Sequence, residues 1–225
     1  INDESMLVQV IILSAFSKSS LNRYVTIKGS VVMRSLSGEI SCDTQDIDLD
    51  FIRYSLSEEA IKLFVEKLNC IEGIQLKIEA PIEELKHQDY KGKRIYIEIS
   101  DTDGNVLSSK MDIGVHKDLD IEQEEYCFDI CYDEESASVL INSKAQMIAE
   151  KLKSLIRFGT RSTRYKDVFD ICYLSDFVDS NQLQQCIEKY ILSDVTLGVT
   201  SVDEIKKRAE RVFTNSTYKK QVERS

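Results

Sequence analysis

Hydrophobic and polar positions in the first half of the chain follow two periods, one typical of helices and one typical of strands. Apolar side chains in residues 6–19 recur at the spacing of a helix with one buried face. In residues 46–53, charged and apolar side chains alternate one by one, which is the pattern of a half-buried strand. The other elements predicted in this half are an extended segment at 24–28, helical turns at 31–36, a helix at 57–69, and strands at 74–80, 94–100, 107–115 and 126–132.

Turn and helix signals then divide the chain into two portions. Asp-Thr-Asp-Gly-Asn at 101–105 predicts a tight hairpin between two of the strands. After residue 143 the pattern is helical throughout, and Ser162 or Thr163 is expected to cap the second helix. The helices predicted there are 144–158, 162–177, 181–192 and 202–213. We therefore predict an α+β fold, with a mixed α/β core at 1–137 and a helical portion at 138–225.

The bulk composition indicates a globular, cytoplasmic protein. The chain has 225 residues, 42% hydrophobic and 30% charged, with one proline and eight glycines, so it can bury a sizeable core without long disordered linkers. Its best apolar run, residues 6–16, is too short to span a membrane and lacks the flanks of a signal peptide. Because the chain opens at Ile1 and not at a methionine, we expect the native N-terminus to lie upstream.

Six cysteines are scattered through apolar segments, and none of them forms a C-x-x-C pair. They are predicted to be reduced, buried thiols of a cytoplasmic protein. A zinc site is not expected, because His87 and His116 lack the spacing of zinc-finger ligands. His116 is predicted to be a surface histidine, and the alternative is a position near the site that follows the strand of Asp112. The cysteines are Cys42, Cys70, Cys127, Cys131, Cys172 and Cys186.

Charge is unevenly distributed along the chain. The net charge of −10 argues against extensive coating of nucleic acid, and residues 118–135 hold nine acids and no lysine or arginine. Residues 144–166, by contrast, hold seven basic residues and only one acid. A local basic surface is therefore compatible with an acidic protein.

Asp46 and Asp48 are the residues that best indicate chemistry. Residues two apart on a strand point to the same face, so these carboxylates repel each other unless a cation neutralises them. Mg²⁺ prefers hard oxygen ligands and commonly takes one or two carboxylates plus substrate phosphates. Asp50 continues the same face further along. The pattern indicates either a magnesium site or an exposed acidic strand face.

Two further segments favour the metal site. Gly29 and Ser30 precede the acids, and a glycine before a helix N-terminus lets backbone amides approach a phosphate closely. Asp112 lies among apolar residues of the strand at 107–115 and is a candidate third carboxylate from a neighbouring strand. A two-metal site activates the attacking hydroxyl with one ion and grips a triphosphate with the other. We therefore predict that Gly29 and Ser30 contact a nucleotide and that Asp112 joins the metal ligands.

The order of motifs resembles that of the AbiEii-type nucleotidyltransferases. Lys28-Gly29-Ser30, followed by Thr-Gln-Asp-Ile-Asp-Leu at 44–49, is similar to the family signature KGG(S/T)…S-x-DIDL. The chain departs from the family pattern near Cys42, where an arginine is usual, and at Lys166, which replaces another arginine. The segments similar to further family motifs, in the same order, are 90–94 (YKGKR), 111–114 (MDIG), 148–152 (IAEKL) and 164–171 (RYKDVFDI).

The resemblance implies a polymerase-β-like nucleotidyltransferase core with a mixed sheet, and a helical C-terminal portion that completes the active-site cleft. It implies that Asp46 and Asp48 hold Mg²⁺ (or Mn²⁺), that Lys151 binds the phosphates of a nucleoside triphosphate, and that Asp167 is a further essential acid. Members of the family act as toxins in toxin–antitoxin and phage-defence pairs, and some transfer nucleotides to the 3′ end of tRNA.

The helical portion can bring Lys151 and Asp167 together. Helices joined by a short turn pack antiparallel, so both residues can face one cleft, and Asp170 shares the face of Asp167. A compact ammonium suits a phosphate. The alternative is a structural ion pair between two helices.

A basic turn lies between these two residues in the sequence. It is a plausible contact for RNA phosphates, and the alternative is a solvated basic loop. The aromatic residues nearby, Phe158, Tyr165 and Phe169, are predicted to belong to the core and not to stack on bases. The cationic residues of the turn are Arg157, Arg161, Arg164 and Lys166.

Three functions follow from these features. The first is an Mg²⁺-dependent nucleotidyltransferase, the toxin of a toxin–antitoxin pair, which uses a nucleoside triphosphate to modify RNA such as the 3′ end of tRNA and is held by a cognate antitoxin. The second keeps the fold but transfers the nucleotide to a small molecule or a protein hydroxyl. The third is a catalytically silent module that binds a partner protein.

Overall fold

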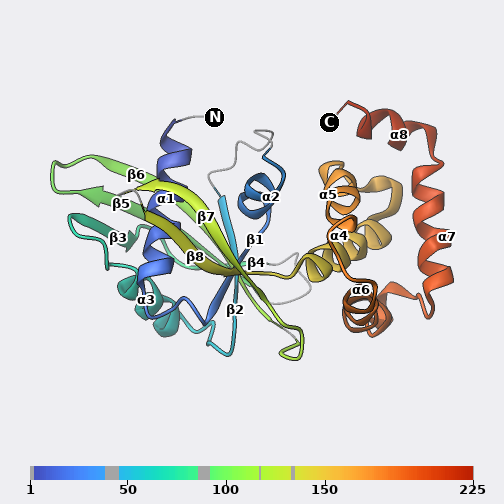
Figure 1. Cartoon of the computed structure of the whole chain (residues 1–225), viewed down its shortest axis with the longest axis horizontal. Helices are drawn as coiled ribbons and strands as arrows, with labels where there is room; N and C mark the ends of the chain where they lie inside the picture. The colour runs from blue at the N-terminus through green and yellow to red at the C-terminus, as the bar shows by residue number, and fades with distance from the viewer. Residues whose placement is uncertain (1–2, 39–45, 86–91, 117, 133–134, 225) are drawn as a thin grey trace. The chain divides into compact units, whose positions relative to one another are not determined.

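An eight-stranded sheet occupies the first part of the chain in the computed structural model (Figure 1). Seven strands follow the order β3-β5-β6-β2-β1-β8-β7, and β4 pairs with β5 off this path. The sheet is mixed, because β2–β6 and β1–β8 are parallel and the other pairs are antiparallel. The strands are β1 (Val25–Lys28), β2 (Asp46–Phe51), β3 (Ile74–Ile78), β4 (Glu83–Leu85), β5 (Gly92–Asp101), β6 (Val106–Val115), β7 (Glu124–Tyr132) and β8 (Glu135–Ile141).

The structure describes residues 3–38, 46–85, 92–116, 118–132 and 135–224. They form two compact units, Ile1–Asn142 and Ser143–Ser225. The boundary predicted after residue 137 lies inside β8, and β8 belongs to the first unit because it pairs with β1 and β7. No helix among the described residues is long and apolar enough to cross a membrane.

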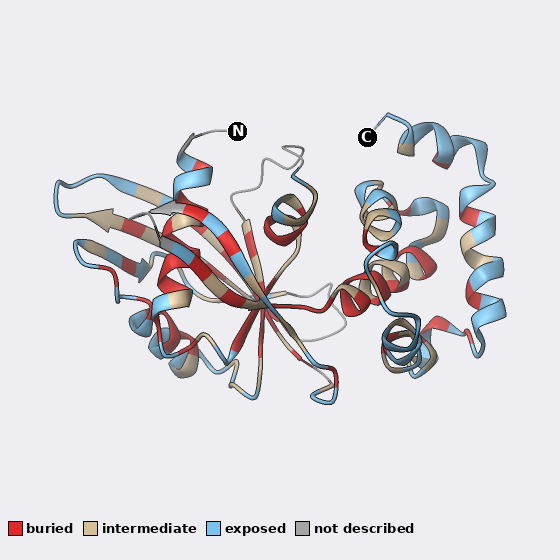
Figure 2. Cartoon of the chain, viewed as in Figure 1, coloured by how far each residue is buried: buried red, intermediate tan, exposed pale blue. Residues whose placement is uncertain are grey.

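The alternation in β2 produces a sheet with one apolar and one charged face. Ile47, Leu49 and Phe51 are fully buried, and the aspartates between them lie on the opposite face. Helices α1 (Asp3–Lys18) and α3 (Glu58–Lys67) contribute to the apolar side, since Phe64 of α3 packs on Phe51 and on Phe16 of α1. Figure 2 shows buried positions repeating along the strands of this unit. The predicted strand and helices at these positions are confirmed.

Local signals in the sequence explain where several elements begin and end. Ser57 caps α3 by accepting a hydrogen bond from the Ala60 amide, as its position before two glutamates predicts. The hairpin between β5 and β6 turns at residues 101–105, where Asp101 accepts the backbone N–H groups of Asp103 and Asn105. Helix α2 (Ser30–Ser37) corresponds to the short helical segment predicted after Gly29.

Two strands are absent from the sequence prediction. Strand β8 was missed because its first half, Glu-Ser-Ala-Ser, has little strand propensity. It also pairs with β1, a strand that is distant from it in the sequence. Strand β4 has only three residues, too few for periodicity to detect. Two of the segments that resemble family motifs lie partly outside the described residues. They are 90–94, of which residues 90–91 are not described, and 44–49, of which Thr44 and Gln45 are not described.

The second unit consists of helices that pack around α4 (Lys144–Phe158). Leu155 of α4 forms a small core with Val212 and Tyr218, and Figure 2 shows α4 to be largely buried. Ser143 caps α4, and Gly159 ends it with a positive φ of 54°. The other elements are η1 (Gly159–Arg161), α5 (Lys166–Ser175), α6 (Ser180–Ile187), the π-helical η2 (Glu188–Leu192), η3 (Val195–Leu197), α7 (Val202–Phe213) and α8 (Ser216–Val222).

The start of α5 differs from the prediction. The 3₁₀ turn η1 follows α4, and the Ser162 hydroxyl accepts the Arg164 amide within the connecting turn, so it does not cap a helix. Helix α5 begins at Lys166 after Tyr165, which makes no side-chain cap. The predicted cap at Ser162 or Thr163 is therefore wrong, because the Ser162 hydroxyl binds the backbone of the turn that precedes α5.

The predicted burial of the cysteines is also wrong for most of those described. Cys186 is buried, but Cys70, Cys127 and Cys172 are exposed free thiols. Cys70 follows the end of α3, Cys127 lies on the edge strand β7, and Cys172 lies on the outer side of α5. Apolar neighbours in sequence did not predict burial, because neighbouring positions of a strand or helix face in different directions. Cys42 lies outside the described residues.

Candidate functional site

Pairing between β2 and β6 brings three predicted metal residues onto one face of the sheet. Asp48 lies beside Asp112, and Asp46 lies beside Lys110, in the parallel register of the two strands. Side chains at paired positions of neighbouring strands point to the same side. Asp46, Asp48 and Asp112 therefore form one row of carboxylates opposite the apolar face.

Two of these carboxylates have basic partners that the sequence did not reveal. The Lys110 ammonium lies 2.6 Å from the Asp46 carboxylate, and Arg94 donates two hydrogen bonds, of 2.7 and 2.8 Å, to the two oxygens of Asp112. These hydrogen bonds raise the pKa of the Arg94 guanidinium. The expectation that only a cation from outside the chain would neutralise Asp46 is wrong, because Lys110 lies beside it on the neighbouring strand β6.

Asp48 is the member of the row that carries the least compensated charge. Burial raises the pKa of the Asp48 carboxyl, Lys28 lowers it, and the nearby Asp112 and Asp46 raise it again, with a net upward shift. Among the described residues, no hydrogen bond or ion pair to the Asp48 carboxylate is found. Its oxygens are therefore the best placed in this row to accept a cation.

Gly29 lies directly against the Asp48 carboxylate. It has a φ of 74°, and a Cβ at this position would meet the Asp48 Oδ2 atom at 2.3 Å. Gly29 therefore satisfies two requirements at once, the left-handed backbone and the close approach. Ser30 is the first residue of α2, whose N-terminal end begins at this glycine. The sequence predicted that Gly29 approaches a phosphate, and the structure identifies Asp48 as its near neighbour.

A buried hydrogen-bond chain fixes Asp50 and Lys28 beside the row. Asp50 is 2% exposed, and its two oxygens are bound by Lys28 Nζ at 2.8 Å and by the Asn142 side-chain amide at 3.1 Å. Asn142 in turn accepts the Thr26 hydroxyl. Asp50 is thus a structural residue that holds Lys28 near Asp48, and Lys28 and Asp48 lie opposite each other in the register of β1 and β2. The sequence indicated only that Asp50 shares a strand face with Asp48, and not that it binds Lys28.

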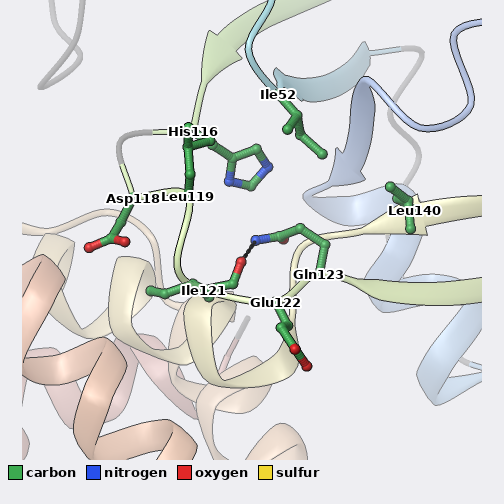
Figure 3. Close-up of a pocket in the computed structure, with 8 residues that line it drawn as sticks. All are labelled: Ile52, His116, Asp118, Leu119, Ile121, Glu122, Gln123 and Leu140. Carbon is green, nitrogen blue, oxygen red and sulfur yellow. Dashed lines mark hydrogen bonds between the residues drawn. The ribbon is translucent and has the colours of Figure 1, made fainter.

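His116 is the last member of this series of hydrogen bonds, and it is not the surface histidine that was predicted. It is only 9% exposed, and its Nε2 atom lies 2.7 Å from the Thr26 hydroxyl oxygen. Because Thr26 directs its one proton to Asn142, the His116 Nε2 atom is the donor of this hydrogen bond. Burial lowers the pKa of His116, which favours the neutral imidazole. Its ring also borders a cavity of about 320 Å³, lined by Ile52, Asp118, Leu119, Ile121, Glu122, Gln123 and Leu140 (Figure 3).

The donor set on this face fits a divalent cation held jointly with phosphates. Asp46 and Asp48 offer hard oxygen ligands, which Mg²⁺ prefers. Asp112 fits less well, since both its oxygens accept hydrogen bonds from Arg94. Within the described residues, no group of three Asp, Glu, His or Cys side chains is arranged to hold a metal alone. A cation here would need further ligands from a substrate.

The helical unit brings Lys151, Asp167 and Asp170 together. The Lys151 ammonium lies 3.0 Å from the Asp167 carboxylate and 2.7 Å from that of Asp170. Burial acts to lower the pKa of Lys151, but the two carboxylates outweigh it and the net shift is upward. This geometry agrees with the predicted meeting of Lys151 and Asp167, and it is also what a structural ion pair would give.

The basic turn is only partly available to a ligand. Arg157 binds the Asp194 carboxylate at 2.9 Å, and Lys153 binds the same carboxylate at 2.7 Å. Arg161, Arg164 and Lys166 are exposed. Of the four cationic residues predicted to contact phosphate, these three are therefore exposed to solvent, whereas Arg157 is bound to Asp194.

The predicted core role of two aromatic residues near the turn is wrong. Phe158 is 48% exposed and Phe169 is 45% exposed, because each lies on the outer side of its helix. Tyr165 is partly buried and packs against the core formed by Leu155, Val212 and Tyr218, as predicted.

Asp194 ties together the end of α4 and the turn η3, and we expect its loss to weaken the helical unit. Hydrogen bonds from Lys153 and Thr196 hold the pKa of the Asp194 carboxyl well below its usual range. A lowered pKa stabilises the fold at pH values above the ordinary carboxyl pKa of about 4, and the contribution is lost as pH falls towards the folded-state value. Asp194→Asn should therefore reduce the free energy of unfolding by about 1–3 kcal/mol at pH 7, and by less at pH 3.

Urea unfolding at both pH values measures this difference. The control is Asp179→Asn, because Asp179 caps α6 through hydrogen bonds to the Asn181 and Gln182 amides, and asparagine caps helices equally well. An Asp194→Asn effect that is equal at pH 7 and pH 3 would contradict the ionic origin of the stabilisation.

Comparisons with known proteins place these features in a family. Residues 11–223 match the family model described as "Nucleotidyl transferase AbiEii toxin, Type IV TA system". No curated protein matches the chain.

Two solved structures are similar to it at low sequence identity. One is the antibiotic-resistance factor ANT(2'')-Ia, with 14% identity, a TM-score of 0.52, and coverage of 88% of this chain and 97% of that one. The other is an antigenic nucleotidyltransferase-like protein from Paracoccidioides brasiliensis, with 17% identity, a TM-score of 0.48, and coverage of 95% and 98%. The first likeness supports a nucleotidyltransferase fold, and the family model spans nearly the whole chain. The chain therefore belongs to the AbiEii family, the nucleotidyl transferase toxins of type IV toxin–antitoxin systems.

Proposed function

We propose that this protein transfers a nucleotide from a nucleoside triphosphate to an RNA, at the 3′ end of a tRNA, in a reaction that requires Mg²⁺ or Mn²⁺. The observation that carries the proposal is the Asp48 carboxylate. It is crowded by Asp46 and Asp112, has a raised pKa, and lies against the backbone of Gly29. A divalent cation and a triphosphate supply the charge and the ligands that this arrangement accepts.

Each residue of the row has a distinct task in the proposed reaction. Asp46 and Asp48 would hold the metal ion, which would supply Lewis-acid stabilisation of the charge on the transferred phosphoryl group. Lys110, which contacts Asp46, would be available to a phosphate oxygen when Asp46 binds the ion. Asp112 orients Arg94 through two hydrogen bonds and is a metal ligand only if it releases them. Gly29 and Ser30 present the start of α2 to the nucleotide.

In the helical unit, we assign nucleotide binding to Lys151, with Asp167 beside it. An ammonium has three N–H groups, and two of them point at Asp167 and Asp170. We assign the third N–H to a phosphate oxygen of the nucleotide. Asp167 and Asp170 act by keeping Lys151 charged and in place, as the raised pKa of the ammonium indicates.

Incubation with each labelled nucleoside triphosphate, in the presence of Mg²⁺, tests the reaction. Total RNA, a mixture of small hydroxyl compounds, and cell protein are offered in separate reactions. We expect label in RNA only, and loss of label when a chelator is added. Label confined to small molecules or to protein would exclude the RNA acceptor and favour a nucleotidyltransferase of another specificity. A cognate antitoxin, expected for a type IV system, is a candidate inhibitor of the same reaction.

Reversal of the exposed arginines tests the RNA contact. The double variant Arg161→Glu/Arg164→Glu should label RNA at least about tenfold more slowly, and its rate should depend less steeply on salt, because each lost phosphate contact removes counterion release. Nucleotide affinity should be unchanged. Lys206→Glu/Lys207→Glu is the matched control, since it changes the net charge equally at exposed positions of α7. Equal loss in both variants would mean that the net charge matters and not this turn.

A further inference from the structure

Three aromatic rings follow one another along the outer side of α5 and in the turn just after its C-terminal end. Phe169 and Phe177 are 45% and 60% exposed, and Tyr173 lies between them in the sequence. The ring centroids of Phe169 and Tyr173 are 6.2 Å apart with planes at 19°, and those of Tyr173 and Phe177 are 5.2 Å apart. We call Phe169, Tyr173 and Phe177 the aromatic row.

The row is not an extension of the hydrophobic core. The four-residue spacing places Phe169 and Tyr173 on one side of α5, whereas the fully buried Leu174 lies on another side, and the Phe177 ring lies next to that of Tyr173 just beyond the helix. Asp167 and Asp170 are bound to Lys151 and are not aimed along the row. Phe169 and Phe177 are exposed and Tyr173 is half-buried, and contiguous aromatic surfaces of this kind commonly mark binding sites.

Charge around the row favours one class of ligand. Arg161, Arg164 and Lys166 are exposed at the N-terminal end of α5, where they precede the first ring. Asp176, also exposed, lies at the other end beside Phe177. Aromatic side chains next to a cationic surface are the combination that binds single-stranded nucleic acid, in which bases stack on rings and phosphates contact lysine and arginine.

We propose that the aromatic row is a stacking platform for unpaired bases of the RNA acceptor, with the RNA phosphates bound at Arg161, Arg164 and Lys166. This inference rests on the proposed function, because it takes RNA as the acceptor. It adds a preference for single-stranded RNA over a duplex, since paired bases have no free faces.

A single tryptophan placed in the row reports stacking directly. The chain has no tryptophan, so Phe169→Trp introduces a unique fluorophore. The emission of this variant should be quenched by a single-stranded RNA of about 12 nucleotides, a length within the usual site size, and not by a duplex of equal length. Phe213→Trp is the matched control, since Phe213 is 42% exposed on α7 and should give no quenching.

Removal of the rings tests the affinity. Phe169→Ala/Phe177→Ala should raise the Kd for the single strand, measured by the anisotropy of labelled RNA, on the order of tenfold or more, while circular dichroism and nucleotide affinity stay unchanged. Phe169→Trp should keep the affinity of the parent. Parent affinity in the double alanine variant would overturn the proposal and assign the row to another occupant, such as a protein.

The outcomes separate this inference from the proposed function. If the parent protein labels RNA while the emission of the Phe169→Trp variant is insensitive to a saturating single strand, stacking is excluded and RNA transfer stands. If the emission of that variant is quenched by RNA that the parent never labels, stacking stands and the RNA transferase function fails. A parent protein that neither binds nor labels RNA overturns both.

Discussion

We expect Asp48→Asn to reduce nucleotide transfer by at least on the order of 10²–10³-fold, because a carboxylate that holds the metal contributes to charge stabilisation in the transition state. Asparagine keeps the shape of the side chain but removes its negative charge. Burial and the neighbouring Asp112 raise the pKa of Asp48, so the ionised carboxylate is unfavourable in the fold alone. The variant should therefore unfold at the same or a higher temperature than the parent.

The combination of lost activity and retained stability distinguishes a functional carboxylate from a structural one. Asp129→Asn is the control, because Asp129 is an exposed strand carboxylate on β7 of the same unit. It should change neither transfer nor Tm. Full activity in Asp48→Asn would sink the metal-site proposal, and so would unfolding of this variant at the growth temperature. Calorimetric titration with Mn²⁺ in the presence of a non-hydrolysable triphosphate should show lost metal binding in the same variant.

The second large effect is expected for Lys151→Met. This change should weaken nucleotide affinity at least about tenfold, the effect of losing one charge-assisted hydrogen bond to a phosphate. It should also lower stability, because Asp167 and Asp170 are each only 15% exposed and would face each other without a counter-ion. Loss of stability alone is therefore not evidence of phosphate binding.

A triple variant separates the two effects. Lys151→Met/Asp167→Asn/Asp170→Asn removes the repulsion and should restore Tm, but calorimetry with the non-hydrolysable triphosphate should still show weak binding. Lys153→Met is the matched control on the same helix, since it breaks the pair with Asp194 and should lower Tm without changing nucleotide affinity. If the triple variant binds nucleotide as tightly as the parent, Lys151 is a structural ion-pair residue.

Periodicity predicted most of the fold, because most elements here are long and strongly patterned. Strand β2 alternates strictly, and α4 has both its serine cap and its terminal glycine in the sequence. Strand β8 was missed because its position is set by parallel pairing with β1, more than a hundred residues earlier. Such pairings are properties of the tertiary structure and leave little trace in a local window.

The candidate site was predicted by residue type but not by its electrostatics. The D-x-D pattern identified Asp46 and Asp48, yet the partners Lys110 and Arg94 come from strands paired side by side. His116 was expected at the surface, since nothing in its neighbours shows that Thr26 lies within hydrogen-bond distance. Exposure was mispredicted for Phe169 for a related reason, because an aromatic residue in a helix can face either side.

The pairing of Lys110 with Asp46 has a consequence for how the metal would arrive. Four neighbouring carboxylates, Asp46, Asp48, Asp50 and Asp112, are opposed by three cations, Lys28, Arg94 and Lys110. This cluster thus has only one carboxylate more than it has cations, and a free divalent ion that bridges Asp46 and Asp48 must displace Lys110 from Asp46 to bind. A chelated ion brings its own anionic phosphate oxygens, to which the displaced lysine can donate hydrogen bonds. Nucleotide and metal are therefore expected to bind as one complex, with little affinity for either alone.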